Sequence, residues 1–214
     1  MKGMFLMSRV IQYSVVVVLF VQASALADDG WTKMFNGKDL SGWKVTTENP
    51  QSWKVKDGML MCAGPRAHLF YVGQDKPFKN FHFKAEVKTT KGSNSGIYFH
   101  TRYQESGWPK AGFECQVNVT HNDKKKSSGL YAVSDVADPG IKDDEWYTQE
   151  IVVRGRNIQL KINGKTMVDY TEKDGQKPYD KNFERLLGEG TFALQAHDPD
   201  SVVYFKNLVV KRLP

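Results

Sequence analysis

Two stretches of the chain decide the fold, NSGIYFHTRY at residues 94–103 and GFECQVNV at residues 112–119. Apolar and polar residues alternate in both, which is typical of a β-strand with one buried face. The first strand turns Ile97, Phe99 and Thr101 to one side, and Tyr98, His100 and Arg102 to the other. The second buries Phe113, Cys115, Val117 and Val119, leaving Glu114, Gln116 and Asn118 on the opposite face. Residues 104–111, with Gly107 and Pro109, indicate the connecting loop.

The same alternation recurs at residues 81–88, 146–154, 157–162 and 191–197, and residues 130–133 read as a short apolar strand. Roughly a dozen strand candidates without a helical period predict an all-β, two-sheet antiparallel jelly-roll sandwich. Residues 173–190 are irregular and polar. With no repeat or linker in sight, we expect one domain over residues 28–214. Its predicted core contains Phe83, Ile97, Phe99, Phe113, Val117, Ile151, Leu160, Phe192 and Phe205.

The first 27 residues have the pattern of a signal peptide. Lys2 and Arg9 precede an apolar run at residues 10–21, and Ala25-Leu26-Ala27 forms a small-x-small cleavage site. The apolar run is short for a membrane span, and two aspartates directly follow the cleavage site, so we expect no stable membrane anchor. The chain is therefore predicted to be secreted or periplasmic after cleavage near Ala27.

Charge and cysteine content exclude several classes of protein. The net charge of +6 is spread out, and its one dense cluster, Lys124 to Lys126, lies in loop-like sequence. Nucleic-acid binding is disfavoured because a basic stripe interleaved with aromatic residues is missing. The two cysteines, Cys62 and Cys115, lack the spacing of a metal site. A disulfide between them is feasible in an exported protein, but Cys115 belongs to an apolar strand face, so we favour two buried thiols. Oligomeric state is not indicated.

Three polar strand faces carry the candidate chemistry: Tyr98, His100 and Arg102; Glu114 and Gln116; and Gln195 and His197. His197, at a strand end, could act as a general base, although a histidine there is as often a plain loop residue. Arg102 could stabilise an oxyanion. Glu114 could be a base or could orient Arg102, and a simple salt bridge between them is the competing interpretation.

The other candidate residues would bind a polyol. His100, Gln116 and Gln195 could hold ring hydroxyls, and Tyr98, Tyr131 and Trp108 could stack on a sugar, although each of these aromatic residues is more often plain packing. No cofactor is implied. A divalent metal on His100, Glu114 and His197 is chemically feasible but lacks diagnostic spacing.

The usual glycosidase pair of carboxylates is missing. Sandwich-fold retaining glucanases carry an E-x-D-x-E pattern along one strand, whereas this chain has FECQV at residues 113–117. A direct glycosidase mechanism is therefore disfavoured. A non-catalytic carbohydrate-binding module is the competing class, since such sandwiches often only bind.

Several motifs resemble one family. WTKMFNGKDLSGW at residues 31–43 is similar to the opening LFNGKDLSGW signature of the 3-keto-disaccharide hydrolase domain family. Residues 94–100, 112–116, 190–197 and 203–208 resemble its other landmarks, so the likeness covers nearly all of the chain after residue 27. It implies a concanavalin A-like fold and an exported protein that acts on oxidised glycosides. It supports Arg102, Glu114, Gln116 and His197 as motif positions without assigning roles.

Chemistry on a 3-keto sugar needs only one base and one oxyanion stabiliser. The ketone acidifies the C2 proton, the enolate expels the C1 substituent, and water then adds back. We expect His197 to be the base, with Glu114 as the alternative, and Arg102 to anchor the enolate.

Overall fold

The computed structural model describes residues 30–214, so the predicted signal peptide lies outside the described residues. This part of the chain contains strands and one short 3-10 helix, η1, and no α-helix. The elements in chain order are β1 (Trp31–Lys33), β2 (Trp43–Val45), η1 (Pro50–Ser52), β3 (Trp53–Lys56), β4 (Met59–Ala63), β5 (Ala67–Tyr71), β6 (Phe81–Thr89), β7 (Asn94–Thr101), β8 (Phe113–Asn118), β9 (Tyr147–Arg154), β10 (Asn157–Ile162), β11 (Lys165–Thr171), β12 (Thr191–Ala196) and β13 (Val202–Arg212).

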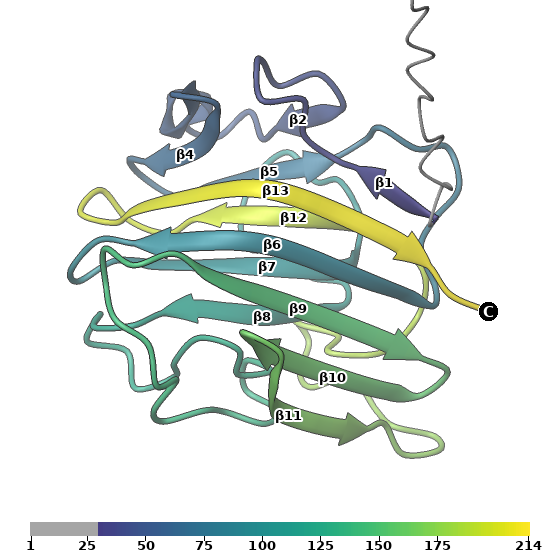
Figure 1. The fold of residues 1–214 in the computed structure, drawn as a ribbon. Coiled ribbons are helices and arrows are strands. Elements are labelled where there is room, and N and C mark those ends of the chain that lie inside the picture. Colours follow the sequence, from purple (N-terminus) through teal and green to yellow (C-terminus); the bar gives the residue numbers. More distant parts are fainter. Residues whose placement is uncertain (1–29) are drawn as a thin grey trace, which may run out of the picture.

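The strands form two sheets that pack face to face (Figure 1). The larger sheet follows the order β11-β10-β9-β6-β13-β4-β3, with β1 added to β13, and the smaller follows β2-β5-β12-β7-β8. Every strand pairing is antiparallel. The predicted all-β, two-sheet antiparallel sandwich is confirmed.

The core lies between the sheets and is rich in aromatic rings. All nine predicted core residues are fully buried. Phe83 of β6 stacks on Phe192 of β12 with ring centroids 4.9 Å apart, which joins the two sheets directly. Such pairs add about 0.5–1.5 kcal/mol to the gain from burying their area. The inward side chains of the small sheet therefore hold it in place, and its outward side chains are left for other uses.

Two segments differ from the sequence-based expectation. Strand β5 was not predicted, because all five of its residues are buried and no alternation marks it. Residues 130–133, predicted as a strand, form a turn in which only Leu130 bridges to Cys115 and Ser134. Ala132 has a positive φ of 62° there, which is incompatible with an extended strand.

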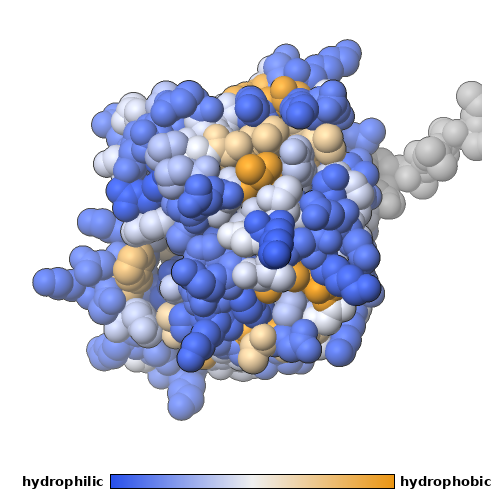
Figure 2. All heavy atoms as spheres, turned by 90° about the vertical axis from the view of Figure 1, so that its left-hand side faces the viewer, coloured by the Kyte–Doolittle hydropathy of each residue, from blue (hydrophilic) through white to orange (hydrophobic). Residues whose placement is uncertain are grey.

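The two cysteines are free and buried, as predicted. Burial raises the pKa of each thiol to about 12, so both are neutral at physiological pH. In the view of Figure 2 the surface is mostly hydrophilic, with apolar residues in small separate groups. Within residues 30–214, no helix has the length and hydrophobicity that crossing a membrane requires.

Candidate active site

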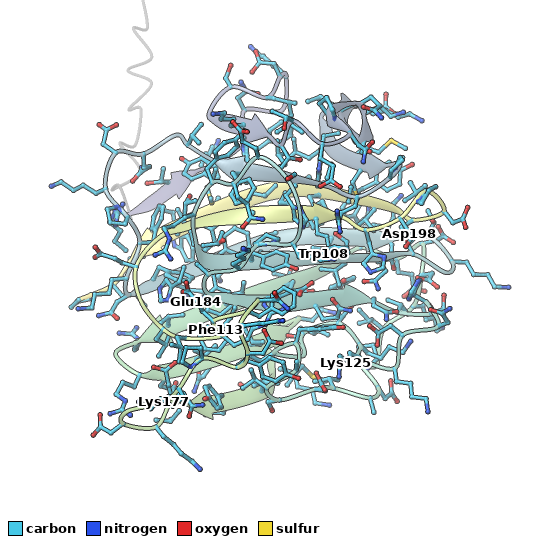
Figure 3. The ribbon with its side chains drawn as sticks, turned by 180° about the vertical axis from the view of Figure 1, so that it is seen from behind. Trp108, Phe113, Lys125, Lys177, Glu184 and Asp198 are labelled. Atoms are coloured by element: carbon cyan, nitrogen blue, oxygen red, sulfur yellow. The ribbon has the colours of Figure 1, made fainter. Side chains whose placement is uncertain are left out.

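A cavity of about 440 Å³ opens on the face of the smaller sheet that points away from the core. Its floor consists of Tyr98 on β7, Glu114 and Gln116 on β8, and Gln195 on β12. Trp108, Tyr131 and residues of the loop between β11 and β12 form its walls. Figure 3 shows this side of the molecule, with Trp108 and Asp198 toward one end of the sheet and Glu184 toward the other. The volume lies in the range of small-molecule sites.

A closed hydrogen-bond network centres on Glu114. Its Oε1 accepts from Gln195 Nε2 at 2.8 Å, and its Oε2 accepts from the Tyr98 hydroxyl at 2.9 Å. Arg185 Nη2 approaches the same Oε2 at 3.4 Å. The antiparallel register places Tyr98 directly opposite Glu114, which explains why these two side chains meet.

Burial dominates the electrostatics of this floor. It raises the pKa of Glu114, and the positive charge of Arg185 acts in the opposite direction. Burial and the neighbouring Glu114 charge raise the pKa of Tyr98 well above its usual value. Tyr98 is therefore a neutral hydrogen-bond donor at physiological pH.

A histidine–aspartate pair stands at the end of β12. His197 Nδ1 lies 2.7 Å from Asp198 Oδ2, and the same oxygen accepts from Ser201 Oγ at 2.8 Å. Burial would raise the pKa of Asp198, but hydrogen bonds from His197 and Ser201 outweigh it and lower the pKa. A carboxylate next to Nδ1 holds the ring proton there and leaves the lone pair on Nε2, the arrangement of an oriented general base.

Trp108 covers this pair from the loop between β7 and β8. Its ring centroid lies 5.3 Å from that of His197. The loop is anchored because Gly107 N donates to Glu48 Oε2 at 2.8 Å, and the Arg66 guanidinium lies 5.0 Å from the Trp108 ring. The indole is thus a fixed apolar wall beside the imidazole.

Two predicted site residues lie outside this cavity. Arg102 is largely exposed and pairs with Glu184 at 3.1 Å, rather than with Glu114. His100 points away from the cavity: Gly188 N donates to its Nδ1 at 3.2 Å, and its Nε2 lies 2.8 Å from the carbonyl oxygen of Lys79. The structure therefore does not place His100 and Arg102 on the polar face with the other predicted site residues.

A break in the strand explains both errors. His100 has a positive φ of 56°, and the register of β7 against β12 shifts there, so that Phe99 faces Phe192 while Thr101 faces Thr191. One residue is thereby skipped, and the alternation that began at Tyr98 no longer holds beyond it. Gly112 and Gly190 flank the break, where an added Cβ would lie 2.1 Å and 2.4 Å from the carbonyl oxygens of Phe99 and Thr101.

Arg185 occupies the position that sequence reasoning gave to Arg102. It comes from the irregular segment between β11 and β12, and only 5% of its surface is exposed. Nothing in the local pattern marked it, because a loop has no period from which burial can be predicted. His68 on β5 was also missed: it is fully buried beside Tyr98 and Trp108, with ring centroids 5.6 Å away in both cases.

The three residues considered as a feasible metal site do not converge, since His100 lies outside the cavity. Among the described residues, His121, His197 and Asp198 place one potential ligand atom each within 4.8 Å of one another. However, Asp123 N donates to His121 Nδ1 at 3.1 Å, which puts the imidazole proton on Nε2, the atom 3.8 Å from Asp198. A protonated Nε2 cannot ligate a metal, and Asp198 already accepts several hydrogen bonds. The cluster is better described as a hydrogen-bonded network.

Seven of the nine predicted site residues thus line one cavity: Tyr98, Trp108, Glu114, Gln116, Tyr131, Gln195 and His197. Their individual roles stay predictions. The open face of this jelly-roll sheet combines aromatic walls, two glutamine side chains and an oriented imidazole. This combination is typical of a carbohydrate-active β-sandwich protein.

The chain belongs to the family of the 3-keto-alpha-glucoside-1,2-lyase-like domain, whose model matches residues 30–211. A 3-keto-disaccharide hydrolase of Bacteroides thetaiotaomicron is 25% identical, over 86% of this chain and 79% of that protein. The resemblance inferred from the motifs is confirmed.

Solved structures agree with the fold. A candidate glycosyl hydrolase of Parabacteroides distasonis superimposes with a TM-score of 0.67 at 25% identity, covering 86% of this chain and 99% of that one. The carbohydrate-binding module CBM66 of Bacillus subtilis reaches a TM-score of 0.55 at 12% identity, over 79% of this chain and 95% of that module. The second likeness concerns the fold alone.

Proposed function

We propose that this chain is an exported enzyme that cleaves 3-keto-glycosides by elimination followed by hydration. The observation that carries the proposal is the contrast between two titratable groups on one cavity. Both Glu114 oxygens are engaged by protein donors, whereas the His197–Asp198 pair leaves an imidazole lone pair available. The cavity floor thus carries one carboxylate, Glu114, beside one oriented base, while Asp123, Asp135 and Asp180 line the cavity from loops, where Asp135 pairs with Lys125 at 2.7 Å. The floor lacks the two carboxylates on one strand that the sandwich-fold glucanases use.

The reaction follows from this arrangement. His197 Nε2 takes the C2 proton, the C2–H electrons form a C2=C3 bond, and the C3 carbonyl becomes an enolate. The enolate re-forms the ketone as a C1=C2 bond develops and the C1–O bond breaks, and the departing oxygen takes a proton. Water then adds its hydroxyl to C1 and a proton to C2, which gives net hydrolysis. Asp198 holds the imidazole in the correct tautomer and stabilises the imidazolium that forms.

Glu114, the alternative base, is less suited to this role. Its carboxylate is buried and surrounded by Tyr98, Gln195 and Arg185, so it would have to give up one of these contacts to reach a substrate proton. Its burial and contacts are those of a group that positions other side chains. Gln116 and Gln195 remain suited to binding ring hydroxyls, and Tyr131 and Trp108 to packing against the ring.

Solvent exchange at C2 tests the proposal. The protein is incubated in deuterated buffer with a set of 3-keto-glycosides and their unoxidised parents, with and without chelator, and the products are weighed by mass spectrometry. Deuterium at C2 of the keto substrates is expected, together with a fall of ~100-fold or more in turnover for His197→Ala. Equal cleavage of the unoxidised parents without exchange would contradict the mechanism. Sugar binding without any cleavage would identify a binding module instead.

Export is a separate part of the proposal and rests on the pattern of residues 1–27. N-terminal sequencing of the protein recovered outside the cytoplasm should begin at Asp28 or within a residue or two of it. An intact Met1 in a membrane fraction would favour a retained anchor.

A further inference from the structure

Arg185 is the most deeply buried cation that lines the cavity. Three aromatic rings surround its guanidinium, whose central carbon lies 5.2 Å from the Phe183 centroid, 5.6 Å from Tyr131 and 5.9 Å from Tyr98. Its backbone has a positive φ of 48°, an uncommon conformation for a bulky residue. The loop between β11 and β12 therefore adopts a strained conformation that delivers this side chain to the sheet.

The hydrogen bonding of Arg185 is incomplete. Its Nη2 contacts Glu114, but Nε and Nη1 are buried and have no hydrogen-bond partner among the described residues. Two acceptors in the same cavity, Gln116 Oε1 and Gln195 Oε1, are buried and unpartnered as well. Buried polar groups are almost always paired in folded proteins, so a set of unpaired donors and acceptors in one cavity indicates a ligand that pairs with them.

We infer that Arg185 is the catalytic residue that binds the C3 ketone oxygen and stabilises the enolate, with Gln116 and Gln195 accepting from neighbouring hydroxyls. This inference rests on the proposed function. Nε and Nη1 lie on different edges of the planar guanidinium, so one of them donates to the oxygen that gains negative charge during the reaction and the other is left for an adjacent hydroxyl. Glu114 balances the guanidinium charge before the reaction and fixes its position. The site thereby recognises a hydroxy-ketone, the feature that separates an oxidised sugar from its parent.

Two substitutions of Arg185 and one matched control test the inference. Arg185→Lys keeps a positive charge opposite Glu114 but loses the planar set of guanidinium donors, and Arg185→Ala removes the group. Arg102→Gln is the control, because Arg102 is an exposed arginine that contacts the same loop through Glu184 and lies outside the cavity. For a 3-keto-glycoside, kcat and C2 exchange should fall together by ~100- to 1000-fold in Arg185→Lys. The control should stay within about twofold of the wild type, as expected for an exposed ion pair.

Chemical rescue separates a catalytic role from a structural one. Added guanidinium should restore part of the C2 exchange in Arg185→Ala and should have no such effect on His197→Ala. Near-native exchange in a folded Arg185→Lys would overturn the inference alone, with the proposed function intact. Loss of exchange in Arg185→Ala without rescue, alongside an active Arg185→Lys, would likewise assign Arg185 a structural role. If the wild type shows no C2 exchange on any 3-keto-glycoside, the proposed function and this inference fail together.

Discussion

Gly96 leaves the space in which Glu114 sits, and Gly96→Ala tests the geometry of the cavity floor without removing any functional group. An alanine Cβ at this position would lie 2.4 Å from Glu114 Oε1, 3.0 Å from its Cγ and 3.1 Å from its Cδ. A flexible side chain could turn aside. Glu114 cannot do so cheaply, because Tyr98, Gln195 and Arg185 hold its carboxylate. The backbone at Gly96 is ordinary strand, so the added methyl group is the only perturbation.

The expected cost follows from these contacts. Overpacking a well-filled site costs about 1–3 kcal/mol, and displacing a carboxylate loses part of hydrogen bonds worth about 1.5–3 kcal/mol each. We expect the free energy of unfolding to fall by about 2–4 kcal/mol, which at roughly 2–4 °C per kcal/mol for a domain of this size lowers Tm by about 4–16 °C. C2 exchange should fall as well, since Arg185 loses its anchor.

Thermal unfolding by calorimetry, with Gly188→Ala as control, measures this effect. A Cβ at Gly188 meets nothing within 4 Å, and the backbone N–H that donates to His100 is retained, so the control should melt close to the wild type. If Gly96→Ala and Gly188→Ala both match the wild type in Tm and exchange, Glu114 does not occupy the space beside Gly96 and the network described above is wrong.

Three further predictions concern buried groups. Because its oxygens are occupied, Glu114→Gln should reduce kcat at least tenfold less than His197→Ala; the reverse order in steady-state kinetics would make Glu114 the base. With pKa values of about 12, Cys62 and Cys115 should resist a thiol reagent at pH 8 until denaturant is added, and rapid labelling of the folded protein would refute their burial. Burial lowers the pKa of His68 to about 3, so the unfolded chain takes up a proton below about pH 6.5 that the folded chain refuses. The free energy of unfolding should therefore fall as the pH is lowered from about 6.5 to about 3. Because His68→Phe removes this group, the substitution should raise Tm at pH 4 more than at pH 7.

Alternation of apolar and polar residues predicted most of the strands, because burial of one sheet face leaves a period of two in the sequence. Strand β10, predicted at residues 157–162, has those bounds in the structure. In β6, the apolar positions Phe81, Phe83, Ala85 and Val87 are all buried. The method fails where both faces of a strand carry mostly apolar residues, because alternation is then absent from the sequence. Strand β5 is such a case: the core takes one face, Trp108 and Tyr103 contact the other, and His68 is the single polar residue, which does not establish a period.

Within the candidate site, residues on strands could be predicted from the sequence, whereas the residue on a loop could not. Side chains on regular stretches of strand, such as Tyr98 before the break in β7, Glu114 and Gln195, were placed correctly because a strand fixes their direction. Arg185 could not be found in this way, since its burial depends on a loop whose path is set by tertiary contacts, such as the hydrogen bond from Leu187 N to Glu172 Oε2. Its partner did carry a hint: Glu114 is a lone carboxylate on an otherwise neutral face, and a buried carboxylate requires a cation or strong donors nearby.

The sequence contained evidence against the predicted position of Arg102, although alternation alone does not use it. Gly112 and Gly190 each immediately precede a strand next to β7, at positions where a strand former would be more usual. A glycine in such a position often marks a close approach of two backbones, and here each Cβ would collide with a carbonyl oxygen of β7 around His100. Two such glycines converging on one strand indicate a bulge, and a bulge reverses the facing of every residue after it. Gly112→Ala and Gly190→Ala should therefore destabilise the protein more than Gly188→Ala, and equal melting temperatures for all three would remove the explanation offered for Arg102.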